Sequence, residues 1–165
     1  MDYCNSLFIG LPNCVLMKLQ SVLNRATRLI FALPPRVPTT SYLIELHWLP
    51  IKARVEFKIC LLTFKALKFR QPSYLVELLN PLVAETNVAL RSSDDPFRLH
   101  EPRATGERAF AARSFGYMAP RLYNKLPVAL KQLDSVECFK KHLKTFFFSC
   151  AYDIAHRRVT DDYRM

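Results

Sequence analysis

The chain has 165 residues, half of them apolar, so it is long enough to bury the core of one domain. Eleven prolines and only three glycines favour short helices that end at prolines and argue against a glycine-rich sheet. The formal net charge of +10 favours a polyanionic partner, either nucleic acid or an anionic surface, unless the charge serves solubility alone.

The cysteines are few and widely spaced. They are Cys4, Cys14, Cys60, Cys138 and Cys150. An odd number within helical patterns is typical of reduced thiols rather than of a disulfide framework. No charged-then-apolar signal peptide opens the chain, and the uncharged segment 3–17 is too short to span a bilayer. We therefore expect an intracellular protein, nuclear or cytoplasmic, that is not secreted and has no membrane partner.

The first predicted region, residues 1–82, is helical. Asn13 suits the cap of a helix over about 14–33, which closely spaced prolines would end. Apolar residues recur along this helix at alternating spacings of four and three, which predicts a seam packed against another helix. The seam residues are Val15, Leu19, Val22, Ala26, Leu29 and Leu33.

Three further helices are predicted within this first region. Their expected bounds are about 40–46, 50–69 and 73–79. Thr40 or Ser41 suits the cap of the first of these helices, and Ser73 suits the cap of the third. Pro50 fits the first position of the long middle helix, because its missing N–H would have no partner there anyway.

The region 83–115 loses helical periodicity and is irregular. Apolar and polar residues alternate over 97–101, and 108–114 contains a second extended-looking run. This pattern predicts a small β-hairpin with its turn near 104–106.

Residues 116–152 return to helical patterns, and 153–165 form a polar tail that is expected to fray. A short helix is predicted over 117–124. Asp134 and Glu137 form a capping-box pattern at the start of the last helix. One face of that helix would carry Val136, Phe139, Leu143, Phe146 and Cys150. The predicted fold class is therefore mainly α, a single helical domain with one small β-hairpin.

The predicted helix over 50–69 carries a narrow cation strip among apolar positions. The strip consists of Arg54, Lys58, Lys65 and Lys68. At about 100° per residue, these four residues fall within an arc of roughly 80°. Such a strip could follow phosphates and release counterions. The alternative is a plain solvated face on a helix that is otherwise buried.

A second basic set surrounds the irregular region and consists of Arg98, Arg103, Arg108, Arg113, Arg121 and Lys125. Arginine offers a flat, forked donor that suits phosphate and stacks on bases. Aromatic residues interleave with these cations at Phe97, Phe110, Phe115, Tyr117 and Tyr123, a combination that single-strand binders use. Phe110 and Tyr123 could instead fill the core. The predicted nucleic-acid contacts are Arg54, Lys58, Lys65, Lys68, Arg103, Arg108, Arg121 and Lys125.

The sequence offers no complete catalytic or metal-binding pattern. Cys138 and His142 lie one helical turn apart, but zinc needs two more ligands and no Cys-x-x-Cys exists. The Asp-Asp pairs at 94–95 and 161–162 lie beside a proline and in the polar tail, where turn carboxylates are expected. His47 suits a packed histidine better than a base. We expect no catalytic residue, no metal, no cofactor and no small-molecule ligand.

Four short motifs follow one another along the chain: LHWLP at 46–50, LRSSD at 90–94, PRLYNKLP at 120–127 and ECFKKHLKTFF at 137–147. In this order they resemble the carboxy-terminal region of LINE-type (non-LTR) retrotransposon reverse-transcriptase polyproteins, downstream of the catalytic palm. The resemblance covers residues 2–148. Tyr123 stands where this family usually has tryptophan, and both side chains fill an apolar pocket.

The resemblance implies a non-catalytic accessory region of a parent RNA-directed DNA polymerase, because the paired aspartates of the polymerase hairpin and any endonuclease motif are missing. Its partners would be the RNA or DNA backbone and the reverse-transcriptase core of the parent polyprotein. Trp48, Phe110, Tyr123 and Pro127 would be structural anchors. The alternative is a protein–protein docking module, or an inert transposon relic without nucleic-acid contact.

Overall fold

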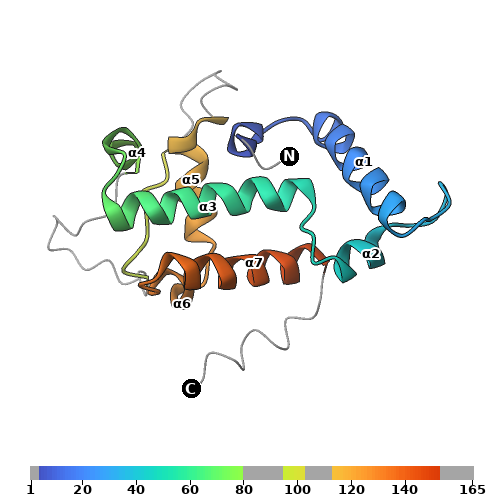
Figure 1. Ribbon diagram of the computed structural model, residues 1–165. Helices are drawn as coiled ribbons and strands as arrows, with labels where there is room; N and C mark the ends of the chain where they lie inside the picture. Colours follow the sequence, from blue (N-terminus) through green and yellow to red (C-terminus); the bar gives the residue numbers. More distant parts are fainter. Residues whose placement is uncertain (1–3, 80–94, 103–112, 153–165) are drawn as a thin grey trace, which may run out of the picture. The chain divides into compact units, whose positions relative to one another are not determined.

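The computed structural model describes residues 4–79, 95–102 and 113–152, and these residues are mainly helical (Figure 1). The mainly α fold class is therefore confirmed. In chain order the helices are the 3₁₀ helix η1 (Asn5–Phe8), then α1 (Asn13–Ile30), α2 (Thr40–Glu45), α3 (Ile51–Phe69), α4 (Ser73–Leu78), α5 (Phe115–Asn124), α6 (Val128–Lys131) and α7 (Val136–Tyr152). Leu99 makes an isolated bridge, and the described ranges contain no strand. The predicted hairpin turn near 104–106 lies outside them.

The chain forms two compact units. The first unit contains the residues up to Phe57 and those from Lys144 onward, and the second unit contains Lys58–Leu143. Helices α3 and α7 each contribute residues to both units. The units therefore group residues that are far apart in sequence, and they cut across the predicted regions 1–82 and 116–152.

Helix α1 begins directly after Pro12 and ends in a left-handed turn. Pro12 holds the N-cap position without a side-chain bond and Asn13 is already helical, so the predicted Asn13 cap is wrong. At the other end, Ala32 has a φ of 49°, and the Leu33 N–H donates to the Arg28 carbonyl at 2.9 Å. This geometry satisfies the last carbonyls and ends the helix before the predicted residue.

The buried face of α1 is not the predicted seam. Val15, Val22 and Leu29 are exposed, Leu29 to 84%. Leu23 and Thr27 are buried instead, and the Thr27 hydroxyl donates to the Leu23 carbonyl at 3.1 Å. The predicted seam is therefore split: Leu19 packs against the core cluster, whereas Val15, Val22 and Leu29 face solvent.

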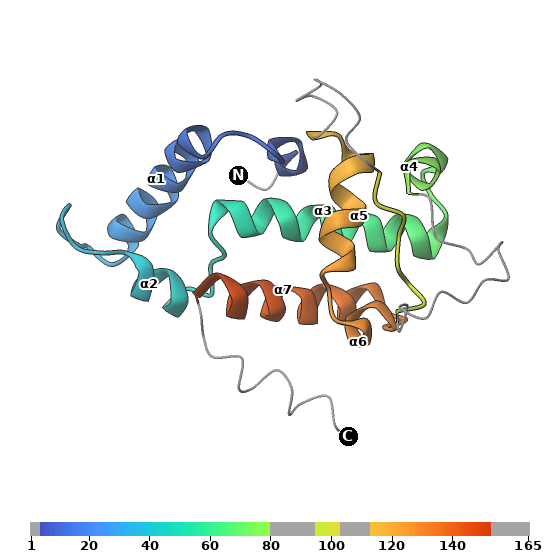
Figure 2. The same cartoon turned by 180° about the vertical axis from the view of Figure 1, so that it is seen from behind.

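Gln20 helps to fix which face of α1 packs against the rest of the first unit. Its Oε1 accepts the Ile51 N–H at 2.9 Å, so it satisfies one of the unpaired donors at the start of α3. Leu16 and Leu19 lie on the same side of α1 as Gln20, and they pack against the cluster around Leu43 and Ile51. Figure 2 shows α1 and α2 meeting within the first unit.

Two other predicted caps are displaced by one residue. Thr39, rather than Thr40 or Ser41, holds the N-cap position of α2, and it makes no side-chain hydrogen bond there. Pro72, rather than Ser73, precedes α4. In both cases no side-chain hydrogen bond caps the start of the helix.

The LHWLP motif ends α2 and begins α3. His47 has a φ of 52°, and the Trp48 N–H donates to the Leu43 carbonyl at 2.9 Å, which closes the end of α2. The Pro50 carbonyl then accepts the Arg54 N–H at 2.9 Å, the first bond of α3. The predicted start of this helix at Pro50 is therefore correct to one residue.

Trp48 is half-buried and packs against the first-unit cluster, which consists of Leu23, Leu43 and Ile51. Tyr152, the last residue of α7, packs against the same cluster, and its hydroxyl donates to the Trp48 carbonyl at 2.5 Å. The indole and the Tyr152 ring thus tie the turn between α2 and α3 to the end of α7, all within the first unit.

The start of α7 lies one residue later than the capping-box pattern requires. The Phe139 N–H donates to the Ser135 carbonyl at 2.9 Å, which makes Ser135 the cap position. The Asp134 carboxylate instead accepts the Lys68 ammonium at 2.6 Å. The predicted capping box of Asp134 with Glu137 is therefore wrong, because the Asp134 carboxylate pairs with Lys68 instead of capping the helix.

The buried face of α7 matches the prediction in its first half. Phe139 and Leu143 are fully buried, and the Phe139 ring stacks on Phe64 of α3 with centroids 3.9 Å apart. Farther along, Phe147 is buried and Cys150 is exposed, so the predicted position of Cys150 on the buried face is wrong. At about 100° per residue, Cys150 lies about 20° and Phe147 about 40° from Leu143 around the helix, so helical spacing alone does not decide which of the two is buried.

We expect Trp48→Ala to lower the free energy of unfolding by about 3 kcal/mol, because it removes a large packed ring and leaves a cavity. The control Tyr152→Phe removes only one hydrogen bond and should cost about 1 kcal/mol. Urea unfolding followed by circular dichroism measures both losses. Equal losses would show that the indole is not the anchor.

Candidate nucleic-acid interface

The predicted cations of α3 have unlike surroundings. In the second unit, Lys65 is exposed and Lys58 is half-buried. The Lys68 ammonium is paired with the exposed Asp134 carboxylate. Leu61 falls within the same arc of the helix and is buried. The cation strip is therefore not a continuous row of solvated charges.

Arg54, the fourth cation of the strip, belongs to the first unit and is held there. Its Nε donates to the Leu49 carbonyl at 2.8 Å, and its guanidinium carbon lies 5.8 Å from the centre of the Trp48 ring. A guanidinium over an indole face is attracted by the ring quadrupole. The arginine therefore stabilises the turn between α2 and α3.

The second basic set is only partly described. Arg103 and Arg108, together with the predicted anchor Phe110, lie outside the described residues. Arg98 and Lys125 are both exposed. These two cations are therefore available to a polyanion.

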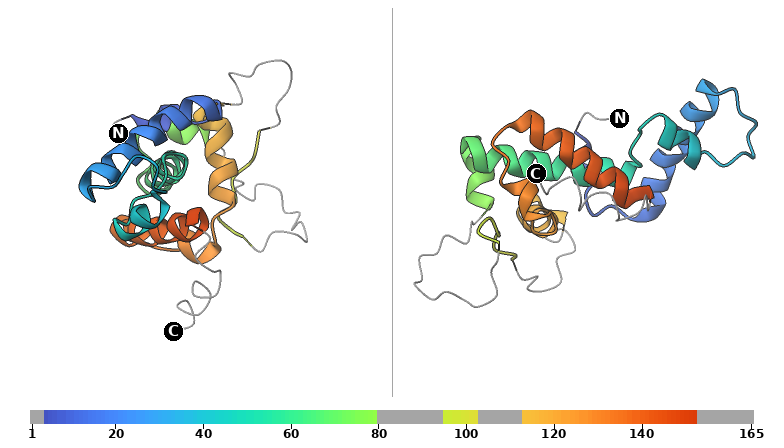
Figure 3. Two further views of the ribbon diagram at one scale, coloured as in Figure 1. Left: turned by 90° about the vertical axis from the view of Figure 1, so that its right-hand side faces the viewer. Right: turned by 90° about the horizontal axis from the view of Figure 1, so that it is seen from below.

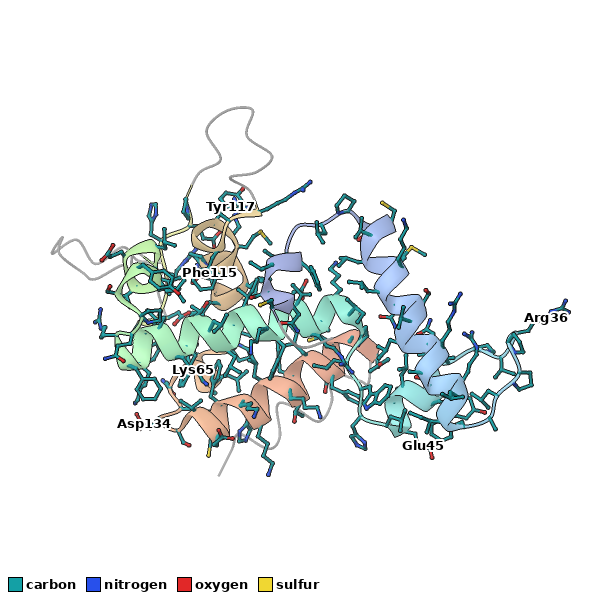
Figure 4. All side chains as sticks on the ribbon, turned by 45° about the horizontal axis from the view of Figure 1, so that its top comes forward. Arg36, Glu45, Lys65, Phe115, Tyr117 and Asp134 are labelled. Atoms are coloured by element: carbon teal, nitrogen blue, oxygen red, sulfur yellow. The ribbon has the colours of Figure 1, made fainter. Side chains whose placement is uncertain are left out.

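Arg121 is stacked within the second unit. Its guanidinium carbon lies 4.1 Å from the centre of the Tyr117 ring, and its Nε lies 4.0 Å from a Glu101 carboxylate oxygen. In Figure 4, Tyr117 lies on one side of α3 and Lys65 and Asp134 lie on the other. Arg121 and Lys65 therefore belong to different surfaces of the second unit.

Exposed aromatic and basic side chains lie close together in sequence at the end of α3. Phe69 is 58% exposed and lies one helical turn after Lys65, on the same face. Arg70 follows with a φ of 55° and is exposed, and Tyr74 in the first turn of α4 is 64% exposed. We call Lys65, Phe69, Arg70 and Tyr74 the basic–aromatic corner.

The sequence prediction found Lys65 but missed the rest of this corner. Helical spacing did not mark Phe69 as exposed, because it lies at the edge of the cation arc in the same direction as the buried Ile51. A large aromatic side chain exposed at the last residue of a mostly buried helix is the informative observation, since large exposed apolar groups are what a binding surface retains.

Asn124 of the PRLYNKLP motif clamps a distant segment. Its side-chain amide accepts the Leu99 N–H and donates to the Leu99 carbonyl, both at 2.9 Å, and it also donates to Glu101 at 2.9 Å. Figures 2 and 3 show the segment 95–102 running beside α5. The motif residue therefore acts as a backbone partner for a segment that has no strand neighbour there.

Lys131 and Asp95 form a second tie that the sequence did not reveal. The Lys131 side chain is completely buried, and its ammonium donates to Asp95 and to the Asn124 carbonyl. The same ammonium lies 5.4 Å from the centre of the Tyr123 ring. Asp95 also accepts the Phe97 N–H at 3.0 Å, as expected of a turn carboxylate. The pair fixes α6 to the start of the segment 95–102.

Tyr123, one of the predicted anchors, is almost fully buried. Burial raises the pKa of its phenol, and the nearby Cys60 and Asp95 act in the same direction. The ring therefore stays neutral and packs. Pro127, another predicted anchor, holds the N-cap position of α6.

The described residues contain no group of three or more His, Cys, Asp or Glu side chains that could hold a metal ion. His142 Nδ1 lies 2.8 Å from the Cys138 carbonyl oxygen, one turn earlier on α7. His47 is exposed, and its ring stacks on Phe148 with centroids 5.6 Å apart. No disulfide joins any of the five cysteines, all of which lie in the described ranges.

Within the part of the chain that the structure describes, no helix has the length and apolar character needed to cross a bilayer. Neither a protein-family model, nor a curated protein, nor a solved structure matches the chain. The family resemblance therefore rests on the four motifs alone, and the function has to be argued from the surfaces of the two units.

We expect Lys131→Met to lower the free energy of unfolding by about 3 kcal/mol, because it leaves the Asp95 carboxylate without its cation. Adding Asp95→Asn removes the unpaired carboxylate charge but keeps an oxygen that accepts the Phe97 N–H. The double variant should therefore recover most of the lost free energy of unfolding. Urea denaturation of the single and double variants measures both values. Losses that simply add would contradict the ion pair.

The Lys68 ammonium lowers the pKa of Asp134 below its ordinary value of 3.8, first by its hydrogen bond and then by its charge. Because the folded pKa is the lower one, the stabilisation is present above the unfolded pKa and is lost as the pH falls through the folded pKa. We expect Lys68→Ala to return the Asp134 pKa toward 3.8. An NMR titration of the carboxyl carbon tests this, and Lys65→Ala should leave the pKa unchanged.

Proposed function

We propose that the chain is a non-catalytic region that binds single-stranded RNA or DNA through the basic–aromatic corner of the second unit. The order of the four motifs supports an origin as the accessory carboxy-terminal region of a LINE-type reverse-transcriptase polyprotein. The net charge of +10 supports a polyanionic partner.

The basic–aromatic corner is the observation that carries this proposal. Lys65 and Arg70 supply two exposed cations for phosphates, and Phe69 and Tyr74 offer exposed rings on which bases can stack. Base stacking on aromatic side chains contributes about 1–3 kcal/mol per base and tolerates any sequence. The corner thus combines the two interactions that sequence-independent single-strand binders use.

The Asp134 carboxylate neutralises part of the positive charge near this corner. Its carboxylate pairs with Lys68, one turn after Lys65 on α3. A phosphate group would compete with this carboxylate for the ammonium. Removing the acidic charge should therefore strengthen binding, which a role of the lysine in stability alone would not predict.

We expect the double variant Lys65→Ala/Arg70→Ala to lower the slope of log affinity against log salt by about 1.4, since each lost phosphate contact to a single strand contributes about 0.7. The double variant Phe69→Ala/Tyr74→Ala should lower the affinity at every salt concentration without changing the slope. Fluorescence anisotropy of a labelled single-stranded RNA, repeated with DNA of the same sequence, measures both effects.

Matched controls separate a defined surface from general charge. Lys52→Ala/Arg36→Ala removes the same charge from two exposed residues of the first unit, and it should leave the slope nearly unchanged. Asp134→Asn should raise the affinity. If the Lys52/Arg36 control lowers the slope as much as Lys65→Ala/Arg70→Ala, the proposed corner is not the site.

Protein–protein docking is a second candidate function, and it has its own observation. Three residues of the predicted seam of α1 remain exposed: Val15, Val22 to 48% and Leu29 to 84%. Apolar side chains that stay in water after a domain has folded favour a partner surface.

A further inference from the structure

The exposed side of α1 carries an alternating pattern of apolar and cationic residues. These residues are Val15, Lys18, Val22, Arg25 and Leu29, and all five are exposed. At about 100° per residue they fall within an arc of roughly 80°. We call this set the outer strip of α1.

The outer strip lies away from the face that builds the first unit. That face packs through Leu23 and Thr27, which are buried. Within the described ranges, no hydrogen bond or ion pair engages the side chains of Lys18 and Arg25. Helix α1 contains no acidic residue at all, so no carboxylate of its own neutralises these cations.

The spacing of the outer strip is that of a coiled-coil seam. Val15, Val22 and Leu29 recur every seven residues, and Lys18 and Arg25 follow the first two by three residues. Positions with this spacing are the a and d positions of a heptad repeat, which face a partner helix. The strip thus presents apolar knobs at a and cations at d.

The cations determine what kind of partner fits. A second copy of α1 would bring lysine and arginine against lysine and arginine, which opposes self-association. A membrane surface requires a wide apolar face, whereas Val15, Val22 and Leu29 span only about 40° of the helix and the two cations border them. A helix with acidic residues opposite Lys18 and Arg25 would pair both charges and cover Val22 and Leu29.

We infer that the outer strip of α1 binds an amphipathic helix of another protein, in which apolar residues alternate with Glu or Asp at heptad positions. This goes beyond nucleic-acid binding, because it uses the first unit and a partner that also covers aliphatic side chains. It specifies the class of partner for the second candidate function, protein–protein docking, and it does not depend on the basic–aromatic corner.

The test uses the full chain and a synthetic helical peptide of about three heptads, with Leu at a and Glu at d. Fluorescence anisotropy should show binding of this peptide, and a peptide with Lys at d should bind at least about tenfold more weakly, as expected for opposed like charges. The double variant Lys18→Glu/Arg25→Glu should reverse the preference. Lys52→Glu/Arg36→Glu, with the same charge change elsewhere in the first unit, should preserve it.

A second variant separates this inference from the proposed nucleic-acid binding. Val22→Ser/Leu29→Ser keeps the charge, so it should weaken binding of the Glu peptide and leave binding of single-stranded RNA unchanged. The inference is overturned if the two peptides bind wild type equally, or if charge reversal does not change the preference. It is also overturned if the serine variant abolishes self-association in sedimentation equilibrium, or binding to phosphatidylcholine–phosphatidylserine vesicles.

Discussion

Helix α3 has almost no polar face, and this constraint governs where polar chemistry can occur. Its residues Ile59, Leu61, Thr63 and Phe64 are spread over about 200° around the helix axis, and all are buried. The one hydroxyl among them is satisfied locally, because Thr63 donates to the Ile59 carbonyl at 2.9 Å. A helix covered on so many sides cannot bind a polymer along its length. In the second unit, the exposed cations Lys65, Lys68 and Arg70 therefore lie in its last turns and directly after it.

The two motifs LHWLP and PRLYNKLP hold the chain together, and neither forms a binding surface. LHWLP ends one helix through the left-handed His47 and begins the next after Pro50. PRLYNKLP buries Tyr123 and uses Asn124 to hold the segment 95–102. Side chains committed in this way to backbone partners and packing have little capacity left for a ligand. The two proposed binding surfaces consequently lie outside the four motifs, on residues that the core does not use.

Two such surfaces differ in chemistry. The basic–aromatic corner combines cations with flat rings, which suits phosphates and bases. The outer strip of α1 combines cations with branched aliphatic side chains at heptad spacing, which suits an acidic helix. Both carry positive charge, so a measurement of affinity at one salt concentration cannot tell them apart. The apolar half of each surface is what distinguishes them, because only aromatic rings stack on bases and only aliphatic knobs pack between helical turns.

The sequence by itself determined the mainly helical fold and the bounds of α3 to one residue, because periodicity and proline act locally. It could not decide which residues of the predicted seam of α1 are buried, since all of them have helical spacing and the choice involves Gln20 bonding Ile51, 31 residues away. The sequence also does not predict the ion pairs Lys68–Asp134 and Lys131–Asp95, because their partners lie 66 and 36 residues apart. Local sequence patterns do not indicate partners at such separations. Only the tertiary structure decided which cations and which apolar side chains remain exposed, because exposure depends on what the rest of the chain covers.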